Sequence, residues 1–186
     1  MEALLVSTGV VALAEIGDKT QLLALVLAAR YRKPLPIILG ILFATLLNHA
    51  LAGAVGSLIA AAVSPASMRW ILGVSFIAMG IWTLIPDKYE EQTAKPPRFG
   101  IFGATLIAFF LLEMGDKTQI ATVALAAKYQ SLTAVVAGTT LGMMLANVPA
   151  VILGEVAAKK LPMKTVHAIA AAIFFVIGLL ILMSGR

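Results

Sequence analysis

Two similar stretches decide the fold: EIGDKTQLLALVLAARY at residues 15–31 and EMGDKTQIATVALAAKY at residues 113–129. Ten of their 17 positions are identical, at a constant offset of 98 residues. Several glycines repeat at the same offset: Gly40 with Gly138, Gly56 with Gly154, and Gly80 with Gly178. The sequence therefore predicts that one structural unit has been duplicated.

The composition is that of an integral membrane protein. Hydrophobic residues make up 61% of the 186 residues and charged residues only 12%, whereas a soluble domain has roughly 25% charged residues. The absence of cysteine excludes disulfides, thiolate metal sites and cysteine nucleophiles. The net charge of +5 does not indicate a nucleic-acid partner, because the basic residues lie in short connections between apolar runs.

Six apolar runs are long enough to cross a bilayer, which takes about 20 residues. We expect an all-α integral membrane protein with transmembrane helices at residues 3–29, 35–63, 68–86, 100–127, 131–157 and 164–184. The N-terminus lacks the basic cluster of a signal peptide, so the first run is expected to remain as a helix. The repeat divides the chain into a three-helix unit at 1–86, a charged cytoplasmic linker at 87–99 and a second three-helix unit at 100–186.

Each unit has an odd number of spans, so the second copy enters the membrane in the opposite orientation. Inverted repeats are typical of secondary transporters, whose binding sites lie near the membrane midplane at the repeat interface. We therefore predict two inverted three-helix repeats around a central site.

The basic residues predict the orientation of the spans. Three lie on the side of the membrane that holds both termini: Arg69, Lys128 and Arg186. Nine lie on the other side: Arg30, Arg32, Lys33, Lys88, Lys95, Arg98, Lys159, Lys160 and Lys164. By the positive-inside rule the side with nine is cytoplasmic, and both termini are expected outside.

Each repeated motif places charged residues deep in a predicted span. Glu15 lies about 12 residues into the first run, roughly 18 Å deep at 1.5 Å per residue, and Glu113 has a similar place in the fourth run. A charged residue at that depth costs about 2.5–3.5 kcal/mol, and six of them on the order of 15–20 kcal/mol if unpaired. Ionisable residues inside a membrane indicate a functional site by default.

The spacing of the motif favours a site for a hard divalent cation. Glu and Asp at positions i and i+3 share one helix face, so two antiparallel copies bring together four carboxylates: Glu15, Asp18, Glu113 and Asp116. Neutral oxygens follow within a turn, from Thr20, Gln21, Thr118 and Gln119. Oxygen ligands suit Ca²⁺, Mg²⁺ and Mn²⁺. Gly17 and Gly115 permit a local helix break, which frees backbone carbonyls to point into the site.

The charges of the two motifs give a simple basis for antiport. Four carboxylates with Lys19 and Lys117 sum to a charge of −2, which one divalent cation or two protons neutralise equally well. Each lysine is at i+4 from the glutamate of its own motif, and we expect it to pair with that glutamate when the metal is absent. The alternative interpretation is a set of structural salt bridges that join the two halves.

Three more polar residues lie mid-span: Asn48, His49 and Asn147. Their simplest interpretation is hydrogen bonding between helices. The alternative is an accessory role at the cation site, with His49 as a proton acceptor. The pair Gly138-x-x-x-Gly142 predicts close approach of a neighbouring helix.

These motifs also resemble those of a known family. Paired E-x-G-D-K-T motifs, one in each half of a small six-span protein, are similar to those of the Gdt-type cation/proton exchangers, uncharacterised protein family 0016. That group includes Golgi manganese and calcium/proton exchangers and bacterial manganese exporters. The resemblance covers nearly the whole chain. It implies that the four acids bind the transported ion, and Lys19, Thr20, Lys117 and Thr118 match the rest of the motif.

The short chain, without a targeting extension, resembles a bacterial member of that group. The resemblance therefore favours export of Mn²⁺ from the cytoplasm, and of Ca²⁺ as a second cargo, in exchange for protons across the inner (plasma) membrane. We expect no enzymatic activity and no resident cofactor. The expected partners are the divalent cation, protons and the lipid bilayer, and homo-oligomerisation stays open.

Other functions remain as alternatives at this point. A Ca²⁺/H⁺ exchanger would use the same ligands, and a cation uniporter or channel would carry fluxes that do not depend on countertransport. A more distant alternative is a membrane enzyme that uses metal-activated water at the carboxylates. Against an enzyme, the motifs contain no histidine at ligand spacing and no nucleophile.

Overall fold

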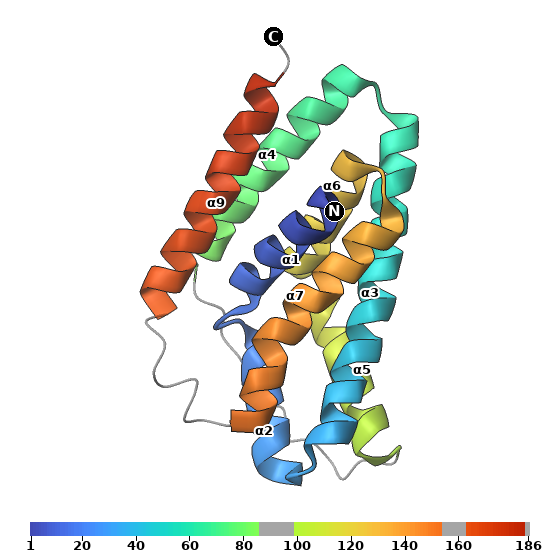
Figure 1. The fold of residues 1–186 in the computed structure, drawn as a ribbon, viewed down its shortest axis with the longest axis vertical. Coiled ribbons are helices and arrows are strands. Elements are labelled where there is room, and N and C mark those ends of the chain that lie inside the picture. Colours follow the sequence, from blue (N-terminus) through green and yellow to red (C-terminus); the bar gives the residue numbers. More distant parts are fainter. Residues whose placement is uncertain (86–98, 154–162, 185–186) are drawn as a thin grey trace.

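The computed structural model describes residues 1–85, 99–153 and 163–184, which form eight α-helices (Figure 1). They are α1 (Glu2–Glu15), α2 (Lys19–Tyr31), α3 (Pro34–Ala62), α4 (Pro65–Thr83), α5 (Gly100–Glu113), α6 (Lys117–Tyr129), α7 (Leu132–Leu153) and α9 (Met163–Met183). The all-helical prediction is confirmed. The predicted linker at 87–99 lies almost wholly outside the described residues.

Three of the described helices, α3, α4 and α7, are each long and apolar enough to cross a membrane. The first and fourth predicted spans are not continuous helices, and this corrects the boundaries drawn from the sequence. Each consists of two shorter helices that meet at a break, α1 with α2 and α5 with α6. The third span also begins earlier than predicted, at Pro65, because Ser64 caps α4 by accepting a hydrogen bond from the Ser67 backbone N–H.

The two copies of the repeat end their second helix in the same way. Arg32 after α2 and Gln130 after α6 have positive φ values of 52° and 49°. The backbone N–H of each donates to a carbonyl one turn earlier, at 2.9 Å to Ala28 and 3.0 Å to Ala126. This left-handed cap satisfies a carbonyl at the helix end and reverses the chain into the next long helix.

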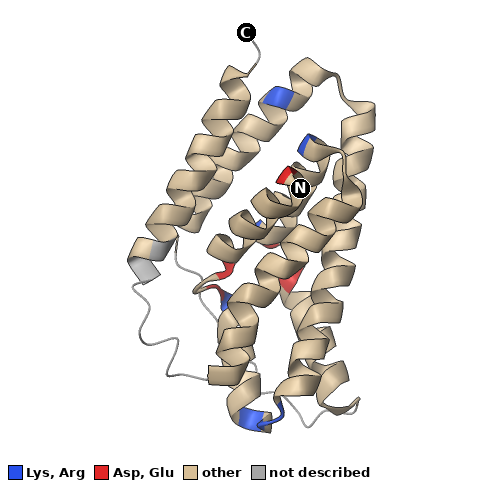
Figure 2. Ribbon diagram, in the orientation of Figure 1, with Lys and Arg blue, Asp and Glu red and all other residues tan. Residues whose placement is uncertain are grey.

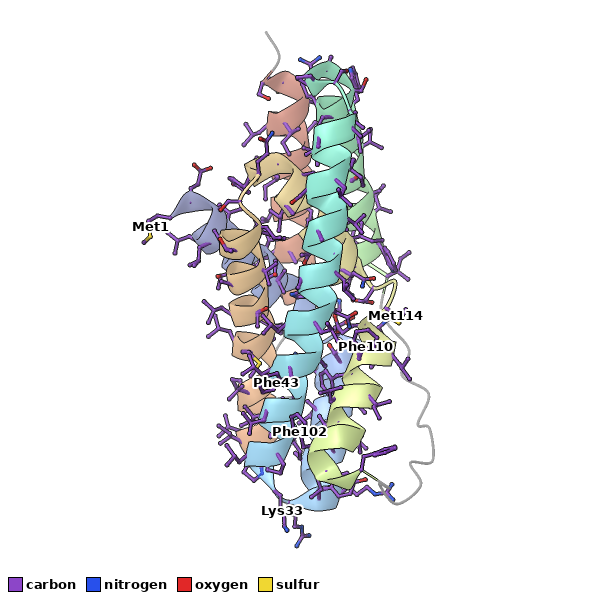
Figure 3. All side chains as sticks on the ribbon, turned by 90° about the vertical axis from the view of Figure 1, so that its right-hand side faces the viewer. Met1, Lys33, Phe43, Phe102, Phe110 and Met114 are labelled. Carbon is purple, nitrogen blue, oxygen red and sulfur yellow. The ribbon has the colours of Figure 1, made fainter. Side chains whose placement is uncertain are left out.

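Each half of the chain packs its broken helices against the long helix of the other half. In the first half α1 packs on α7, and in the second half α5 packs on α3. In Figure 1 the chain descends from α1 to α2 and rises from α5 to α6, so the two broken segments run in opposite directions. Phe43 of α3 and Phe102 of α5 meet edge to face with ring centroids 6.0 Å apart (Figure 3).

Glycines of the two long helices make equivalent contacts across the halves. A Cβ atom on Gly138 would lie 2.5 Å from the Leu4 carbonyl oxygen and 2.8 Å from the Ser7 Cβ. A Cβ atom on Gly40 would lie 3.0 Å from the Phe102 carbonyl oxygen and 2.7 Å from the Thr105 Cβ. Gly138, Phe102 and Thr105 each lie 98 residues after their equivalents Gly40, Leu4 and Ser7, so the two sets of contacts join equivalent residues. The close approach predicted for the Gly138 motif is therefore confirmed, and the two interfaces are related by exchange of the halves.

The last helix of each half forms a separate pair on the flank of the bundle, where α4 lies against α9 (Figure 1). Phe76 and Phe174, which occupy equivalent positions in the repeat, are both buried, with ring centroids 6.1 Å apart. The contact between α4 and α9 therefore joins equivalent residues of the two copies of the repeat.

Replacement of Gly138 by valine is expected to destabilise the protein. The added side chain would collide with the backbone of α1, and overpacking of this kind costs about 1–3 kcal/mol. We expect a lower midpoint of thermal unfolding in detergent and a larger aggregated fraction in size-exclusion chromatography. Gly9→Ala is the control, because a Cβ atom on Gly9 would meet no atom within 4 Å. Equal melting temperatures for the two variants would contradict the packing of α1 on α7.

Candidate cation site

The site is built around two helix breaks, one in each motif. α1 ends at Glu15 and α2 begins at Lys19, while α5 ends at Glu113 and α6 begins at Lys117. Between them Gly17 and Gly115 have φ values of 84° and 78°. Glycine adopts this left-handed conformation without the steric penalty of a side chain. The local breaks predicted from the two glycines are therefore confirmed.

The glutamines of the two motifs stabilise these breaks. The Gln21 side-chain oxygen accepts a hydrogen bond from the Gly17 N–H at 2.9 Å, and the Gln119 side-chain oxygen accepts one from the Gly115 N–H at 2.7 Å. The motif spacing predicted these oxygens as metal ligands. In the structure they accept backbone hydrogen bonds, which the helix break would otherwise leave unmade.

The amide groups of the same glutamines tie the breaks to the long helices. Gln21 donates to the Ala146 carbonyl of α7 at 2.9 Å, and Gln119 donates to the Asn48 side-chain oxygen of α3 at 3.3 Å. Asn48 in turn donates to the Phe110 carbonyl of α5 at 3.0 Å. Hydrogen bonding between helices, the simpler interpretation of Asn48, is confirmed. No sequence signal indicated that the backbone carbonyls of Ala146 and Phe110 would accept these hydrogen bonds.

Three carboxylates converge between the breaks. Glu15, Glu113 and Asp116 are fully buried, and each offers one oxygen atom such that all three atoms lie within 4.8 Å of one another. We call these residues the acid group. Asp18, the fourth predicted acid, is also buried but is not part of the acid group.

Threonine hydroxyls hold the two glutamates. The Thr20 hydroxyl donates to Glu15 Oε2 at 2.6 Å, and the Thr118 hydroxyl donates to Glu113 Oε2 at 3.1 Å. The second oxygen of each glutamate has no hydrogen-bond partner among the described residues. A buried carboxylate oxygen without a partner is costly. An oxygen-ligated cation would satisfy both atoms at once, so the donor set fits the hard cation that the motif predicts.

The lysines of the motifs form ion pairs across the halves. Lys19 Nζ lies 2.7 Å from Asp116 Oδ1, and Lys117 Nζ lies 2.7 Å from Asp18 Oδ1. The i+4 spacing predicted that each lysine pairs with the glutamate of its own motif, and these crossed pairs correct that prediction. Because the motifs run in opposite directions, the start of α2 faces the start of α6, which brings each lysine to the other motif's aspartate.

Acidic and basic residues of the motifs lie together midway along the described part of the bundle. Figure 2 shows red and blue segments together near the middle of the molecule and further blue segments near its two ends. Lys33 lies at one extremity of the long axis, and Met114, beside the second break, lies far from it (Figure 3). The acid group is therefore central along the length of the helices.

Two further polar residues are buried in the long helices beside the breaks. His49 of α3 has no hydrogen-bond partner for either ring nitrogen among the described residues. Asn147 of α7, its equivalent in the repeat, donates to the Met143 carbonyl at 3.1 Å, within its own helix. Among the described residues neither side chain forms a hydrogen bond with the acid group, and their accessory role stays a prediction.

Comparison with known proteins identifies the family of the chain. The family model described as "Divalent cation/proton antiporter GDT1" matches residues 3–91 and 101–186. The chain belongs to the GDT1 family. The resemblance drawn from the paired motifs is therefore confirmed, and the family is one of divalent cation/proton antiporters.

Individual GDT1 relatives cover most of the chain. A Vibrio cholerae protein named "Putative manganese exporter" is 52% identical over 96% of this chain and 90% of its own length. The rice GDT1-like protein 3 is 27% identical over 93% of this chain and 71% of its own length. A GDT1-like protein of Synechocystis is 28% identical, over 89% of both chains. No solved structure matches the chain.

Proposed function

We propose that this GDT1 protein exports Mn²⁺ from the cytoplasm in exchange for protons, through the acid group. The observation that carries the proposal is the convergence of three fully buried carboxylates, with oxygen atoms within 4.8 Å of one another, between two helix breaks. Asp18, Thr20 and Thr118 complete the polar surroundings of the cation. Buried carboxylates of this density are stable only when a cation or protons compensate their charge.

The charge of the site supports exchange rather than simple binding. The four acids and two lysines of the motifs leave a net charge of −2 when all are ionised. A divalent cation and a pair of protons neutralise it equally, and both need the same oxygen atoms. Each species therefore excludes the other, and protons that arrive from outside release the cation there.

The proposed architecture has six spans in two inverted repeats, 1–86 and 100–186. The first and fourth spans are the broken pairs α1–α2 and α5–α6. Two observations support this arrangement: the broken segments run in opposite directions (Figure 1), and glycine contacts of one half recur in the other. Discontinuous helices at a repeat interface are a common way to build a transporter site. Rocking of one half against the other would expose the site to each side in turn.

The choice of Mn²⁺ over Ca²⁺ rests on the Vibrio cholerae relative at 52% identity, which is named as a manganese exporter. The oxygen ligands by themselves suit either ion. A Ca²⁺/H⁺ exchanger therefore remains the second candidate, and the experiment must separate the two ions.

Growth in excess metal tests the cargo. The chain is expressed in a bacterium that lacks its own manganese exporter, and growth is followed over a range of MnCl₂ and CaCl₂ concentrations. We expect tolerance of manganese that is lost with Asp116→Asn, with membrane levels of both proteins checked by immunoblot. Tolerance of calcium alone, dependent on the same residue, would move the assignment to Ca²⁺. Tolerance of neither metal, from protein that reaches the membrane, would contradict the proposal.

The proposed topology places both termini outside and the basic turn between α2 and α3 in the cytoplasm of the cell. The chain contains no cysteine, so a single introduced cysteine is the only thiol that a maleimide can label, and its labelling reports the side of the membrane on which it lies. We expect Lys33→Cys to resist a membrane-impermeant maleimide in intact cells, and Ser131→Cys, its equivalent in the repeat, to react. Labelling of Lys33→Cys but not of Ser131→Cys would reverse the orientation, and labelling of both from the same side would contradict the inverted repeat.

A further inference from the structure

The two crossed ion pairs are equivalent in sequence but not in burial. The Lys117 side chain is 2% exposed and its partner Asp18 is fully buried. The Lys19 side chain is 21% exposed, although its partner Asp116 is also fully buried. Lys117 is therefore enclosed, whereas the four-carbon side chain of Lys19 reaches the surface of the bundle.

The partners of the two lysines also differ in what else they contact. Asp116, which binds Lys19, belongs to the acid group, and its carboxylate lies within 4.8 Å of Glu15 and Glu113 oxygen atoms. Asp18, which binds Lys117, lies outside the acid group. A cation that enters the acid group thus meets the ammonium of Lys19 on one of its own ligands, whereas Lys117 pairs with an aspartate that is not one of the three.

We infer that Lys19 is a built-in competitor of the transported cation. It holds Asp116 while the site is empty, and it leaves when the cation binds. The pair between Lys117 and Asp18 stays closed throughout the cycle as a permanent tie between the halves. This inference rests on the proposed function and adds how an empty site is stabilised.

Displacement of Lys19 also couples binding to movement of the halves. Lys19 begins α2 in the first half, and Asp116 immediately precedes α6 in the second half. Their 2.7 Å pair therefore ties the halves together beside the cation. Cation binding then breaks this tie, because the divalent cation repels the ammonium and competes with it for the single negative charge of Asp116. The halves can then rock about the pair of Lys117 with Asp18, which stays closed, and the Lys19 pair re-forms after the cation has left.

The test compares Mn²⁺ binding by Lys19→Met and Lys117→Met in detergent micelles, measured by isothermal titration with MnCl₂. Both substitutions remove one positive charge near the site, so Lys117→Met controls for the general electrostatic effect. We expect the dissociation constant of Lys19→Met to fall at least about tenfold further than that of Lys117→Met, since it alone removes direct competition. Lys19→Arg, which keeps the charge, is expected to bind Mn²⁺ as the unmodified protein does.

The rate of transport gives a second readout. Loss of a lysine with only a structural role would not both tighten Mn²⁺ binding and slow turnover. In liposomes with saturating Mn²⁺, Lys19→Met is expected to bind tightly yet turn over several-fold more slowly, because release lacks its internal competitor. If Lys117→Met does not fold, the comparison of Lys19→Met with Lys19→Arg decides the question. If the Lys19→Met protein is obtained in low yield, Lys19→Gln replaces it in the test. This variant also removes the charge but keeps an N–H donor for Asp116.

The outcomes separate this inference from the proposed function. Mn²⁺ binding by the unmodified protein with no tightening in Lys19→Met overturns the competitor role and leaves the proposed function standing. Tightening to the same degree in Lys19→Met and Lys117→Met also overturns it, since general electrostatics then accounts for the effect. Absence of Mn²⁺ binding by the unmodified protein contradicts the proposed function, and the inference with it.

Discussion

Glu15→Gln is expected to reduce Mn²⁺ transport at least about 100-fold, which corresponds to roughly 2.7 kcal/mol, while the protein still folds. The substitution keeps the size of the side chain and its acceptor oxygen for the Thr20 hydroxyl, which donates to Glu15 at 2.6 Å. It removes one negative charge from a fully buried group of three carboxylates. A hard divalent cation then loses an anionic ligand that a neutral amide oxygen replaces poorly.

The measurement is the initial rate of Mn²⁺ uptake into liposomes, normalised to the amount of folded protein. Glu2→Gln is the matched control: the same substitution in the same helix, at an exposed residue whose carboxylate accepts a hydrogen bond from Tyr129. We expect transport by Glu2→Gln to equal that of the unmodified protein. Full transport by Glu15→Gln would refute the acid group as the cation site.

Lys117→Met is expected to destabilise the protein by about 3–5 kcal/mol, the usual consequence of removing one member of a buried ion pair. Lys117 is 2% exposed and lies 2.7 Å from Asp18, which would be left as a buried charge without this counter-ion. The free energy of unfolding is measured in mixed micelles by denaturant titration. A loss of this size would abolish folding in a marginally stable protein.

The double variant Asp18→Asn, Lys117→Met separates the ion pair from the packing of the lysine stem. It leaves no buried charge behind, so most of the lost stability should return. Lys128→Met, at the exposed end of the same helix, is expected to change stability by less than about 1 kcal/mol. Equal stabilities of Lys117→Met and Lys128→Met would contradict the buried crossed pair.

The sequence predicted the two helix breaks and the grouping of three of the four acids, because its signals are local and doubled. A glycine between two acids in an apolar run indicated both the helix break and the convergence of carboxylates, and both are present in the structure. The resemblance to Gdt-type exchangers rested on the same residues and is confirmed by the family match.

Other features could not be predicted because they depend on how the halves meet. Spacing within one motif favoured pairing of Lys19 with Glu15, whereas the structure pairs it with Asp116 of the other motif. The hydrogen bond from Gly17 to Gln21 similarly requires a break, since in a continuous helix that N–H would bond to a backbone carbonyl. Hydropathy alone also read each broken pair as one continuous span, because a three-residue break hardly changes an average over about 20 residues.

Proton-driven accumulation of Mn²⁺ tests the central claim most directly. Liposomes that contain the purified protein and a Mn²⁺-sensitive dye are prepared at pH 6 and diluted into MnCl₂ at pH 8, with the membrane potential clamped by potassium and valinomycin. The account predicts that Mn²⁺ accumulates inside above its external concentration, and that a protonophore or Glu15→Gln abolishes this. Mn²⁺ entry that merely equilibrates, at the same rate with or without the pH gradient, would contradict exchange and indicate a uniporter or channel.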